Sequence, residues 1–392
     1  MTEVRLGDPK VAEVSAGQAA PQNMQSFGKS GHPFIRAGSL EFLCSGGSIC
    51  ELEHIEPSVA AEHRLKLFPK HTVVFAKSGM SAKIGRVYRL AEPSYVVSHL
   101  AAITPKEKLD SSYLLYFLQA NPPAKLIPND AYPSIRLSEI ENIIVQLPLL
   151  EEQRRIAAIL DKVDAIRRKR QQSLKLIDDL VKSQFIEMFG DPVTNPMGWE
   201  VVDLERLASL ASGVTKGRKV TNQKLFKVPY MRVANVKDGY IDMSDIKYFE
   251  ATEAEVSQYR LENGDILMTE GGDPDKVGRG AIWIYDMEDC IHQNHIFRVR
   301  LDAQHVRPVY FAEYLKQQKA KQYFLRCAKQ TTGIASINMT QLKKLPVILP
   351  PLLLQNQFAA FVEQADKSKF TMQRQLSEIE ILSSSLKQKF FA

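Results

Sequence analysis

The segment Asn121-Pro122-Pro123-Ala124 comes closest to a catalytic signature in this sequence. It resembles the N-P-P-aromatic motif of amino-methyltransferases, in which an aromatic ring stacks on a base turned out of the helix. Ala124 cannot stack, and no glycine-rich strand-to-helix turn for S-adenosylmethionine lies upstream. We therefore expect an ordinary loop here and no catalytic residues in the chain.

Other reactive side chains are equally isolated. Asp273-Pro274-Asp275-Lys276 has too few carboxylates for metal-dependent cleavage, which needs several placed together. His54, His63 and His71 lack the matched partners of a catalytic triad. The four cysteines have no C-x-x-C spacing, which favours free thiols in a reducing cytoplasm and makes zinc improbable. No metal site is expected.

Polar loops offer a different chemistry. Lys77 to Lys83 and Lys329 to Gly333 mix cations, hydroxyls, amides and glycine, which can reach phosphates and base edges in a DNA groove. The alternative for each loop is a solvated turn. The net charge of +6 is spread thinly, so DNA contact must come from local clusters. The candidate DNA-binding residues are Lys77, Ser78, Ser81, Lys83, Arg86, Lys216, Arg218, Lys276, Arg279, Gln330, Thr331 and Thr332.

The elements that would carry these loops occur twice. Residues 134–164 and residues 336–366 share ten of 31 positions, 202 residues apart. Lys83-Ile84-Gly85-Arg86 matches Lys276-Val277-Gly278-Arg279 in the same order along the chain. His99 and His295 also match; a satisfied interior histidine is the favoured interpretation, and a shared DNA-facing role is the alternative. Such a period indicates two similar domains rather than a solenoid.

Each repeat ends in a long helical segment, Glu151 to Phe189 and Gln355 to Phe391. Apolar residues recur about every 3.5 positions, which is typical of a coiled coil. At about 1.5 Å per residue each helix would be roughly 55–60 Å long. Both helices carry more apolar residues than their mutual pairing needs, and Ile159, Ile166, Leu180 and Phe185 are the candidates for docking another subunit.

The expected fold is α+β, with two mixed α/β domains separated by two long helices in an antiparallel coiled coil, related by a pseudo-two-fold internal repeat. The expected segments are residues 1–147, 148–189, 190–349 and 350–392, alternating globular domain and helix. Runs such as 72–76 and 265–269 predict strands, and 113–118 and 310–315 predict amphipathic helices. No apolar run is long enough to span a membrane.

This arrangement resembles the DNA specificity subunit of type I restriction–modification systems. The resemblance rests on the entry into the first helix, Leu147-Pro148-Leu149-Leu150 followed by Glu151-Glu152-Gln153, and on its degenerate copy from Leu349. A Gly264-Asp265-Ile266 turn followed by Gly271-Gly272 fits the family, whereas the first half has His71-Thr72-Val73 there.

The resemblance implies a non-catalytic, cytoplasmic subunit that binds double-stranded DNA and reads one half of a bipartite target with each domain. It implies two methyltransferase subunits along the helices, motor-nuclease subunits in the full complex, and S-adenosylmethionine on the methyltransferase partners. The alternatives are a coiled-coil adaptor that never touches DNA and a divergent DNA methyltransferase.

Overall fold

The computed structural model describes residues 2–220, 223–331 and 333–391. It divides into two compact units. Unit 1 combines residues 1–173 with residues 372–392, and unit 2 is the continuous stretch 174–371. Each long helix therefore begins in one unit and ends in the other. Among the described residues, no helix is long and apolar enough to cross a membrane.

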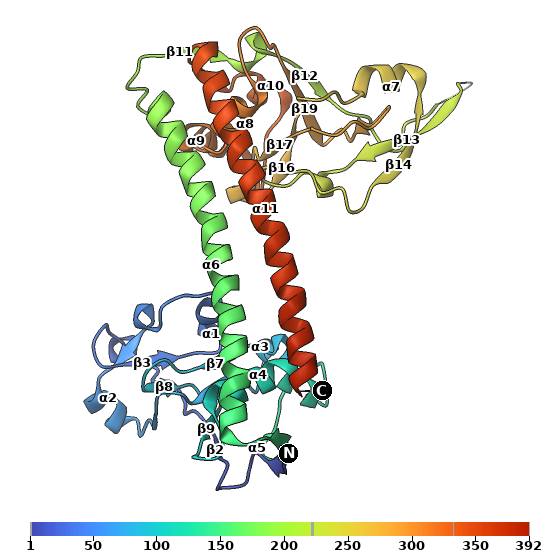
Figure 1. Cartoon of the computed structure of the whole chain (residues 1–392). Helices are drawn as coiled ribbons and strands as arrows, with labels where there is room; N and C mark the ends of the chain where they lie inside the picture. Colours follow the sequence, from blue (N-terminus) through green and yellow to red (C-terminus); the bar gives the residue numbers. More distant parts are fainter. Residues whose placement is uncertain (1, 221–222, 332, 392) are drawn as a thin grey trace. The chain divides into compact units, whose positions relative to one another are not determined.

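Unit 1 contains two small sheets, visible in the blue and cyan part of Figure 1. The first is antiparallel, in the order β2 (Ala12–Ala16), β9 (Leu100–Pro105), β6 (Val73–Ala76), β7 (Val87–Arg89). The second has the order β4 (His54–Ile55), β3 (His32–Ile35), β8 (Ser94–Val96), β5 (Leu67–Phe68), and its β3–β8 pair is parallel. The helices of this unit's recognition domain are α1 (Ser39–Cys44), α2 (Pro57–Glu62), α3 (Met80–Ile84), α4 (Ser111–Ala120) and α5 (Leu137–Glu141).

Unit 2 repeats this plan with different loops. Its antiparallel sheet has the order β12 (Ala208–Ser212), β19 (Ile296–Leu301), β15 (Ile266–Thr269), β17 (Gly280–Ile282). The second sheet, β14 (Lys247–Thr252), β13 (Leu225–Met231), β18 (Ile291–His292), keeps the parallel pair. A third sheet joins β16 (Gly271–Gly272), β21 (Ile334–Ser336) and β20 (Lys329–Thr331). The shorter helices are α7 (Glu253–Tyr259), α8 (Pro308–Leu315), α9 (Gln318–Cys327) and α10 (Met339–Lys343).

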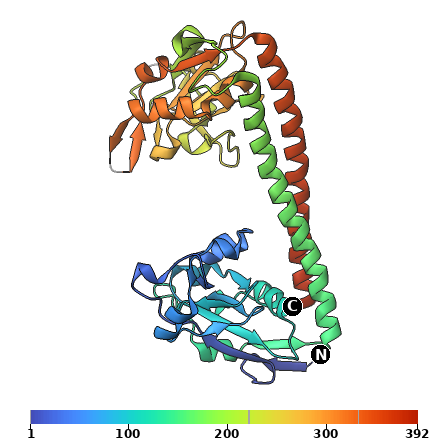
Figure 2. The same ribbon diagram turned by 90° about the vertical axis from the view of Figure 1, so that its left-hand side faces the viewer.

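The long helices are α6 (Leu150–Phe189) and α11 (Leu352–Phe391). In unit 1 the start of α6 and the end of α11 share one core, where Ile156 and Leu160 pack in the cluster that Phe390 contacts. In unit 2 the end of α6 and the start of α11 do the same, with Phe185 5.5 Å from Phe358 between ring centroids. The helices therefore run antiparallel within each unit (Figures 1 and 2).

A two-stranded ribbon leads into each helix, β1 (Thr2–Arg5) with β10 (Ile144–Leu147) and β11 (Glu200–Asp203) with β22 (Pro346–Leu349). Beyond each ribbon a buried glutamine fixes the first turn. The Gln153 amide donates to the carbonyls of Lys108 and Pro148, both at 3.0 Å, and accepts from the Asp110 N–H at 2.9 Å. Gln355 makes the same three bonds in unit 2, to His305, Pro350 and Arg307.

The expected fold class is confirmed, and so are the two predicted strands and the two predicted amphipathic helices. The long helices begin one and three residues earlier than expected. The compact units differ from the sequence segments because the recognition part of each unit packs on the start of one helix and the end of the other.

Candidate nucleic-acid interface

In unit 1 the candidate loop follows β6 and is fixed by backbone hydrogen bonds. The Lys77 N–H donates to the His99 carbonyl at 2.9 Å, and the Lys77 carbonyl accepts from the Ile135 N–H at 2.7 Å. Ser78 Oγ lies 2.8 Å from His99 Nδ1. These hydrogen bonds anchor the backbone at Lys77. The side chains of Lys77 and Ser78 are half-buried, so they reach the surface.

The next residues form α3, which carries Ser81 and Lys83. The Lys83 ammonium lies 3.3 Å from the Asp130 carboxylate, so the α3 surface and residues 129–135 form one edge. Tyr132 on that edge has 82% of its surface exposed. Sequence reasoning missed Tyr132, although an aromatic residue between Asp130 and Pro133 in a polar loop is a usable signal for a stacking or groove contact.

Arg86 belongs to a different place. It precedes β7 and forms an ion pair with Glu41 at 3.1 Å. It also lines a cavity that Lys77, Ser78, Ser81 and Lys83 do not line. The structure therefore brings together four of the five unit 1 candidates.

Unit 2 builds the equivalent edge from the same backbone bonds. The Glu270 N–H donates to the His295 carbonyl at 3.0 Å, and the Glu270 carbonyl accepts from the Ile337 N–H at 2.8 Å. Glu270 therefore occupies the position of Lys77. Next to it, β16 pairs with β21, and β21 pairs with β20, whose Gln330 is exposed.

Three further unit 2 candidates lie within the described residues: Lys276, Arg279 and Thr331. Lys276 ends a short 3-10 helix (Pro274–Lys276) and pairs with Asp273 at 2.5 Å. Arg279, half-buried, precedes β17. Thr331 is the last residue of β20, and Thr332 lies outside the described residues.

Lys216 and Arg218 precede β13 and lie apart from this edge. Lys216 is exposed, with its Nζ 5.9 Å from the centre of the Tyr230 ring. Arg218 forms a two-point ion pair with Glu255 and lies 4.5 Å over the Phe249 ring. The hydrogen bond from Arg218 holds the pKa of Glu255 below its usual range, against the effect of burial. The Arg218 guanidinium is thus engaged within the unit, and its contact with DNA stays a prediction.

The favoured interpretation of His99 and His295 as interior residues is wrong, because both side chains are exposed. They end equivalent turns and meet different partners, Ser78 in unit 1 and Glu270 in unit 2, where His295 Nδ1 lies 2.6 Å from the carboxylate. Their sequence pattern, a polar turn before an apolar strand, does not distinguish a turn at the surface from one inside.

The docking candidates on α6 separate into two kinds. Ile166 and Leu180 are about half exposed, at 49% and 51%, and Ile159 is partly buried. Phe185 is wholly buried, with its ring stacked 5.6 Å from Tyr310. The prediction that Phe185 docks a partner is therefore wrong, because its face of α6 closes the core of unit 2.

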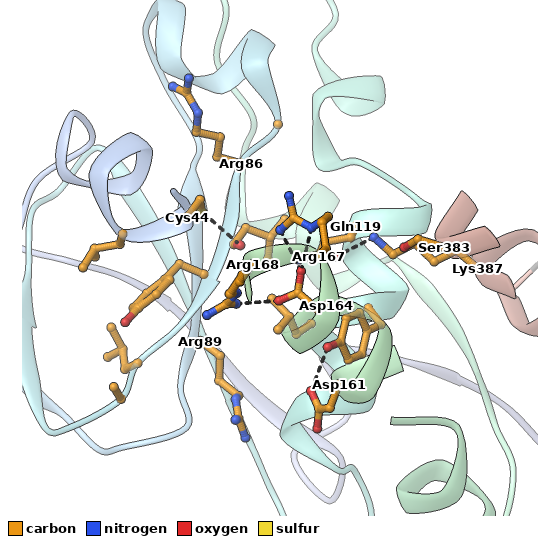
Figure 3. A pocket seen from close by; sticks show the side chains of 18 of the residues that line it. Cys44, Arg86, Arg89, Gln119, Asp161, Asp164, Arg167, Arg168, Ser383 and Lys387 are labelled. Carbon is orange, nitrogen blue, oxygen red and sulfur yellow. Dashed lines mark hydrogen bonds and ion pairs between the residues drawn. The ribbon is translucent and has the colours of Figure 1, made fainter. Parts of the chain in front are cut away.

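The basic run of α6 that begins at Arg167 lies against the unit 1 cavity. Asp164 accepts from Arg167 at 2.7 Å and from Arg168 at 2.6 Å (Figure 3). Burial opposes ionisation of Asp164, but these hydrogen bonds and charges outweigh burial and lower its pKa. The run is thus partly neutralised within the unit.

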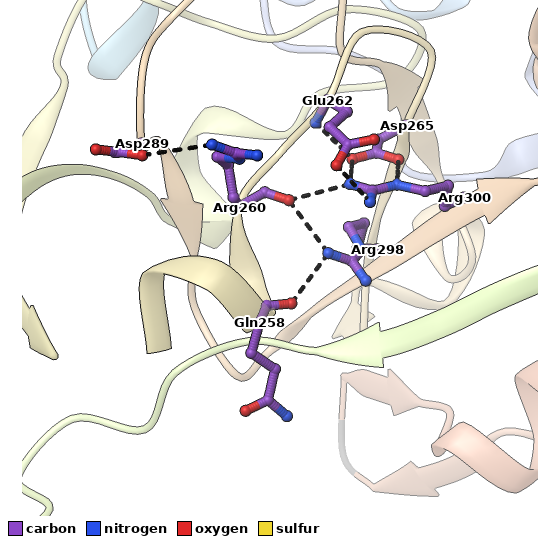
Figure 4. A network of polar contacts seen from close by, with 7 residues as sticks. All are labelled: Gln258, Arg260, Glu262, Asp265, Asp289, Arg298 and Arg300. Carbon is purple, nitrogen blue, oxygen red and sulfur yellow. Dashed lines mark hydrogen bonds and ion pairs between the residues drawn. The ribbon is translucent and has the colours of Figure 1, made fainter. Parts of the chain in front are cut away.

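A polar network supports the strands behind the unit 2 edge (Figure 4). The Arg300 guanidinium holds the buried Asp265 carboxylate at two points, both 2.8 Å, and Glu262 at 2.7 Å. Arg298 donates to the carbonyls of Gln258 and Arg260, both at 3.1 Å. Burial lowers the pKa of Arg298, and the charge of Arg300 lowers it further. This network is structural, since it ties β15 and β19 to the segment after α7.

Residues 121–124 do not fit a methyltransferase site. The Asn121 amide donates to the Phe117 carbonyl at 3.4 Å, and Pro123 begins a one-turn 3-10 helix (Pro123–Leu126), so the segment only closes α4. Within the described residues no three His, Cys, Asp or Glu side chains gather as metal ligands would. The four cysteines are free thiols.

Two similar units with matched scaffolds and different loops define a two-domain specificity protein. The chain matches the family model for the type I restriction modification DNA specificity domain over residues 1–176 and 196–380. It therefore belongs to that family and carries two such domains, whose role is DNA recognition.

Relatives support the assignment. The EcoKI specificity subunit of Escherichia coli strain K12 is 22% identical over 383 residues, which cover 92% of this chain and 81% of that protein. The putative MjaX specificity subunit of Methanocaldococcus jannaschii is 29% identical over 198 residues, 50% of this chain and 46% of that one. The crystal structure of an S subunit from M. genitalium has the same fold, with a TM-score of 0.58 at 13% identity over 100% of this chain and 96% of that one.

Proposed function

We propose that the two units read two different half-sites of one bipartite DNA target. The observation that carries this is the pair Lys77 and Glu270. The same two backbone hydrogen bonds place them at equivalent points of the two edges, yet their charges are opposite. A scaffold that is shared while the charge at one half-buried position is reversed suits recognition of two different sequences.

The chemistry of the two residues differs accordingly. A lysine ammonium only donates, which suits the O6 and N7 acceptors of guanine or a phosphate. A carboxylate only accepts, which suits the N4 amino group of cytosine and is repelled by phosphate. The neighbouring histidines also have different partners. His99 lies against the Ser78 hydroxyl, whereas His295 lies against the Glu270 carboxylate.

Charge reversal tests the proposal in the complex with methyltransferase subunits. Lys77→Glu should change or relax methylation at one half-site only, and Glu270→Lys at the other. Each good base contact is worth roughly 1–3 kcal/mol, or about 5- to 150-fold in preference. Lys108→Gln, an exposed charge in the loop at the far end of β9 from His99, is the control. Equal effects of Lys77→Glu on both half-sites would rule out this division.

The exposed apolar residues of α6 support the proposal that other subunits dock on this helix. We infer that Ile166 and Leu180 help to dock two methyltransferase subunits, which bring S-adenosylmethionine, and that motor-nuclease subunits join the full complex. Leu180→Glu should weaken assembly with the methyltransferase, whereas Lys182→Glu, an exposed neighbour on the same helix, should not. Unchanged 2:1 assembly of Leu180→Glu would contradict this docking site.

The chain is proposed to be non-catalytic. Calorimetry on the purified chain should show no binding of S-adenosylmethionine, and micromolar binding would favour the divergent methyltransferase instead. The adaptor alternative is tested by DNA affinity of the assembled complex at several salt concentrations. An interface of lysines and arginines on phosphates predicts affinity that falls steeply with salt, and no DNA affinity at low salt would favour an adaptor.

A further inference from the structure

Unit 1 contains a cavity of about 780 Å³ where β7, α4, α6 and α11 meet. We call it the cationic pocket. Figure 3 shows Asp164 between Arg167 and Arg168, with Lys387 approaching from α11. A volume of this size suits a small organic ligand.

Positive charge dominates the lining. The lining carries six cations and three acids: Lys70, Arg86, Arg89, Arg167, Arg168 and Lys387 against Asp161, Asp164 and Glu380. Glu41, outside the lining, pairs with Arg86, which leaves an excess of two positive charges. Asp164 is already held by two arginines, and Asp161 accepts from the Tyr116 hydroxyl at 2.7 Å. The acids present therefore do not balance the cations.

Three of these cations lack a carboxylate partner among the residues that the structure describes: Arg89, Lys387 and the exposed Lys70. Arg89 donates to Ser111 Oγ at 3.2 Å and faces His71 Nδ1 at 3.4 Å. Lys387 donates to the Gln119 side-chain carbonyl at 2.8 Å. Burial lowers the pKa of Lys387. Burial and then the charge of Arg89 lower the pKa of His71. An anion in the pocket would relieve both effects.

Unit 2 shows that the fold does not need these cations. At the positions equivalent to Arg89, Arg168 and Lys387 it carries Ile282, Phe370 and Phe185. Unit 2 also has a hollow beside Arg279, the residue equivalent to Arg86, but its volume is only about 20 Å³ and its lining includes no residue of α6 or α11. Phe185 and Ile282 thus pack in the core of unit 2 where unit 1 has Lys387 and Arg89, whereas Phe370 is exposed.

His71 adds an independent observation. Its backbone has a φ of 75°, and the equivalent Gly264 has a φ of 94°. Glycine adopts this conformation freely, whereas other residues pay roughly 1 kcal/mol or more. His71 is exposed and lines the pocket with its Nδ1 3.4 Å from the Arg89 guanidinium, at a backbone position where unit 2 has glycine.

We propose that the cationic pocket binds a small ligand that carries phosphate groups, of the oligophosphate class. Guanidinium groups hold phosphate oxygens at two points, and an ammonium adds a third charge. Arg167 and Lys387 are recessed at the junction with the helices, which favours a small anion over a DNA duplex. The bound ligand would stabilise unit 1 by joining β7 to α6 and α11.

Pyrophosphate is the probe, titrated calorimetrically into the full chain at constant ionic strength. The variants Arg89→Ile and Lys387→Phe place the unit 2 residues in unit 1, so the fold has a precedent for them. Saturable binding that weakens at least 10-fold in each variant and is unchanged in Lys108→Gln, an exposed cation outside the lining, supports the pocket. Near-ultraviolet circular dichroism checks that the variants remain folded.

Two results would overturn the proposal. One is the absence of saturable binding by the wild-type chain, or equal binding by folded variants. The other is displacement of pyrophosphate by a non-cognate DNA duplex, together with an equal loss of duplex affinity in both variants. That second result would assign the cations to the DNA surface instead of to a small ligand.

Discussion

Asp265 and Arg300 face each other across β15 and β19 in a two-point ion pair, at the positions where unit 1 places Thr72 beside Thr104. The two threonine hydroxyls lie 3.1 Å apart and form the corresponding hydrogen bond. One half of the chain therefore closes this strand pair with charges, and the other half closes it with neutral hydroxyls. At this pair of positions, unit 2 thus carries two charged side chains and unit 1 carries two hydroxyl side chains.

This relationship predicts strong coupling between the two positions. Arg300→Thr should destabilise unit 2 by about 3 kcal/mol, because it leaves the Asp265 carboxylate buried without its cation. Asp265→Thr combined with Arg300→Thr should recover all but about 1 kcal/mol by recreating the unit 1 pair. Tryptophan fluorescence in urea measures it cleanly, since Trp199 and Trp283, the two tryptophans of the chain, both lie in unit 2. Additive single effects would show that the pair is not coupled.

The glutamine clamps predict effects confined to one unit. Gln355→Ala removes a side chain that satisfies two carbonyls and one N–H in a buried place, so unit 2 should lose roughly 2–3 kcal/mol. Gln153→Ala should destabilise unit 1 by a similar amount. Fluorescence unfolding should detect the first variant and miss the second, whereas hydrogen exchange at the start of α6 should detect Gln153→Ala. An equal fluorescence response to both would contradict the independence of the clamps.

His292 predicts acid sensitivity of unit 2. The imidazole is wholly buried, its Nδ1 donates to the Ile296 carbonyl at 3.1 Å, and burial followed by the charge of Arg298 lowers its pKa to about 4. The unfolded chain takes up this proton near pH 6.5, and the folded unit only near pH 4. The histidine's contribution is therefore complete above pH 6.5 and is lost as the pH falls toward 4, on the order of 3 kcal/mol in total.

The measurement is urea unfolding of unit 2 at several pH values. His292→Val places the residue of the equivalent unit 1 position, Val96, in unit 2. Between pH 4 and 6.5 the free energy of unfolding of this variant should fall less steeply with decreasing pH than that of the wild type. The difference in slope should correspond to one bound proton. Identical slopes for the two proteins would show that His292 is not the titrating group.

The long helices predict the spacing of the half-sites. Four residues inserted into α6 between Arg167 and Gln172, with four more at the matching part of α11, add about 6 Å of helix. If the helices set the spacing, the unread gap should lengthen by one or two base pairs, since successive base pairs are about 3.4 Å apart. The half-sites themselves should stay the same. An active insertion variant that methylates sites of the original spacing would show that the helices do not act as the ruler.

The fold could be predicted largely from the repeat and the periodicity of the two helical segments. The periodicity is read from residues that are close together in the sequence. It is present because each helix must place an apolar face against a core. The compact units could not be predicted, because the packing of Phe391 on Tyr113, with ring centroids 5.1 Å apart, joins residues far apart in the sequence. Phe185 was misassigned for the same reason. Periodicity shows that it faces something apolar, and only the fold shows that this partner is Tyr310.

The candidate site was predicted in part. The loop after β6 carried enough cations and glycine to be noticed, and the structure brings Lys77, Ser78, Ser81 and Lys83 to one edge. Tyr132 was missed, and His99 and His295 were assigned to the interior, because exposure depends on how a turn is oriented, which composition does not encode. Arg218 looked like a free cation because its partner Glu255 is remote in the sequence.

The division of the long helices also determines when each unit can be completed during synthesis. Unit 2 is one uninterrupted stretch, so its core can close as it leaves the ribosome. Unit 1 lacks the last turns of α11 until about 200 further residues have been added, which takes on the order of 10–40 s at about 5–20 residues per second. Until then Tyr113 and Phe117 have no Phe391 to cover them. The half that emerges first is thus the half that finishes last, and its uncovered aromatic surface is where a chaperone or a premature partner would bind.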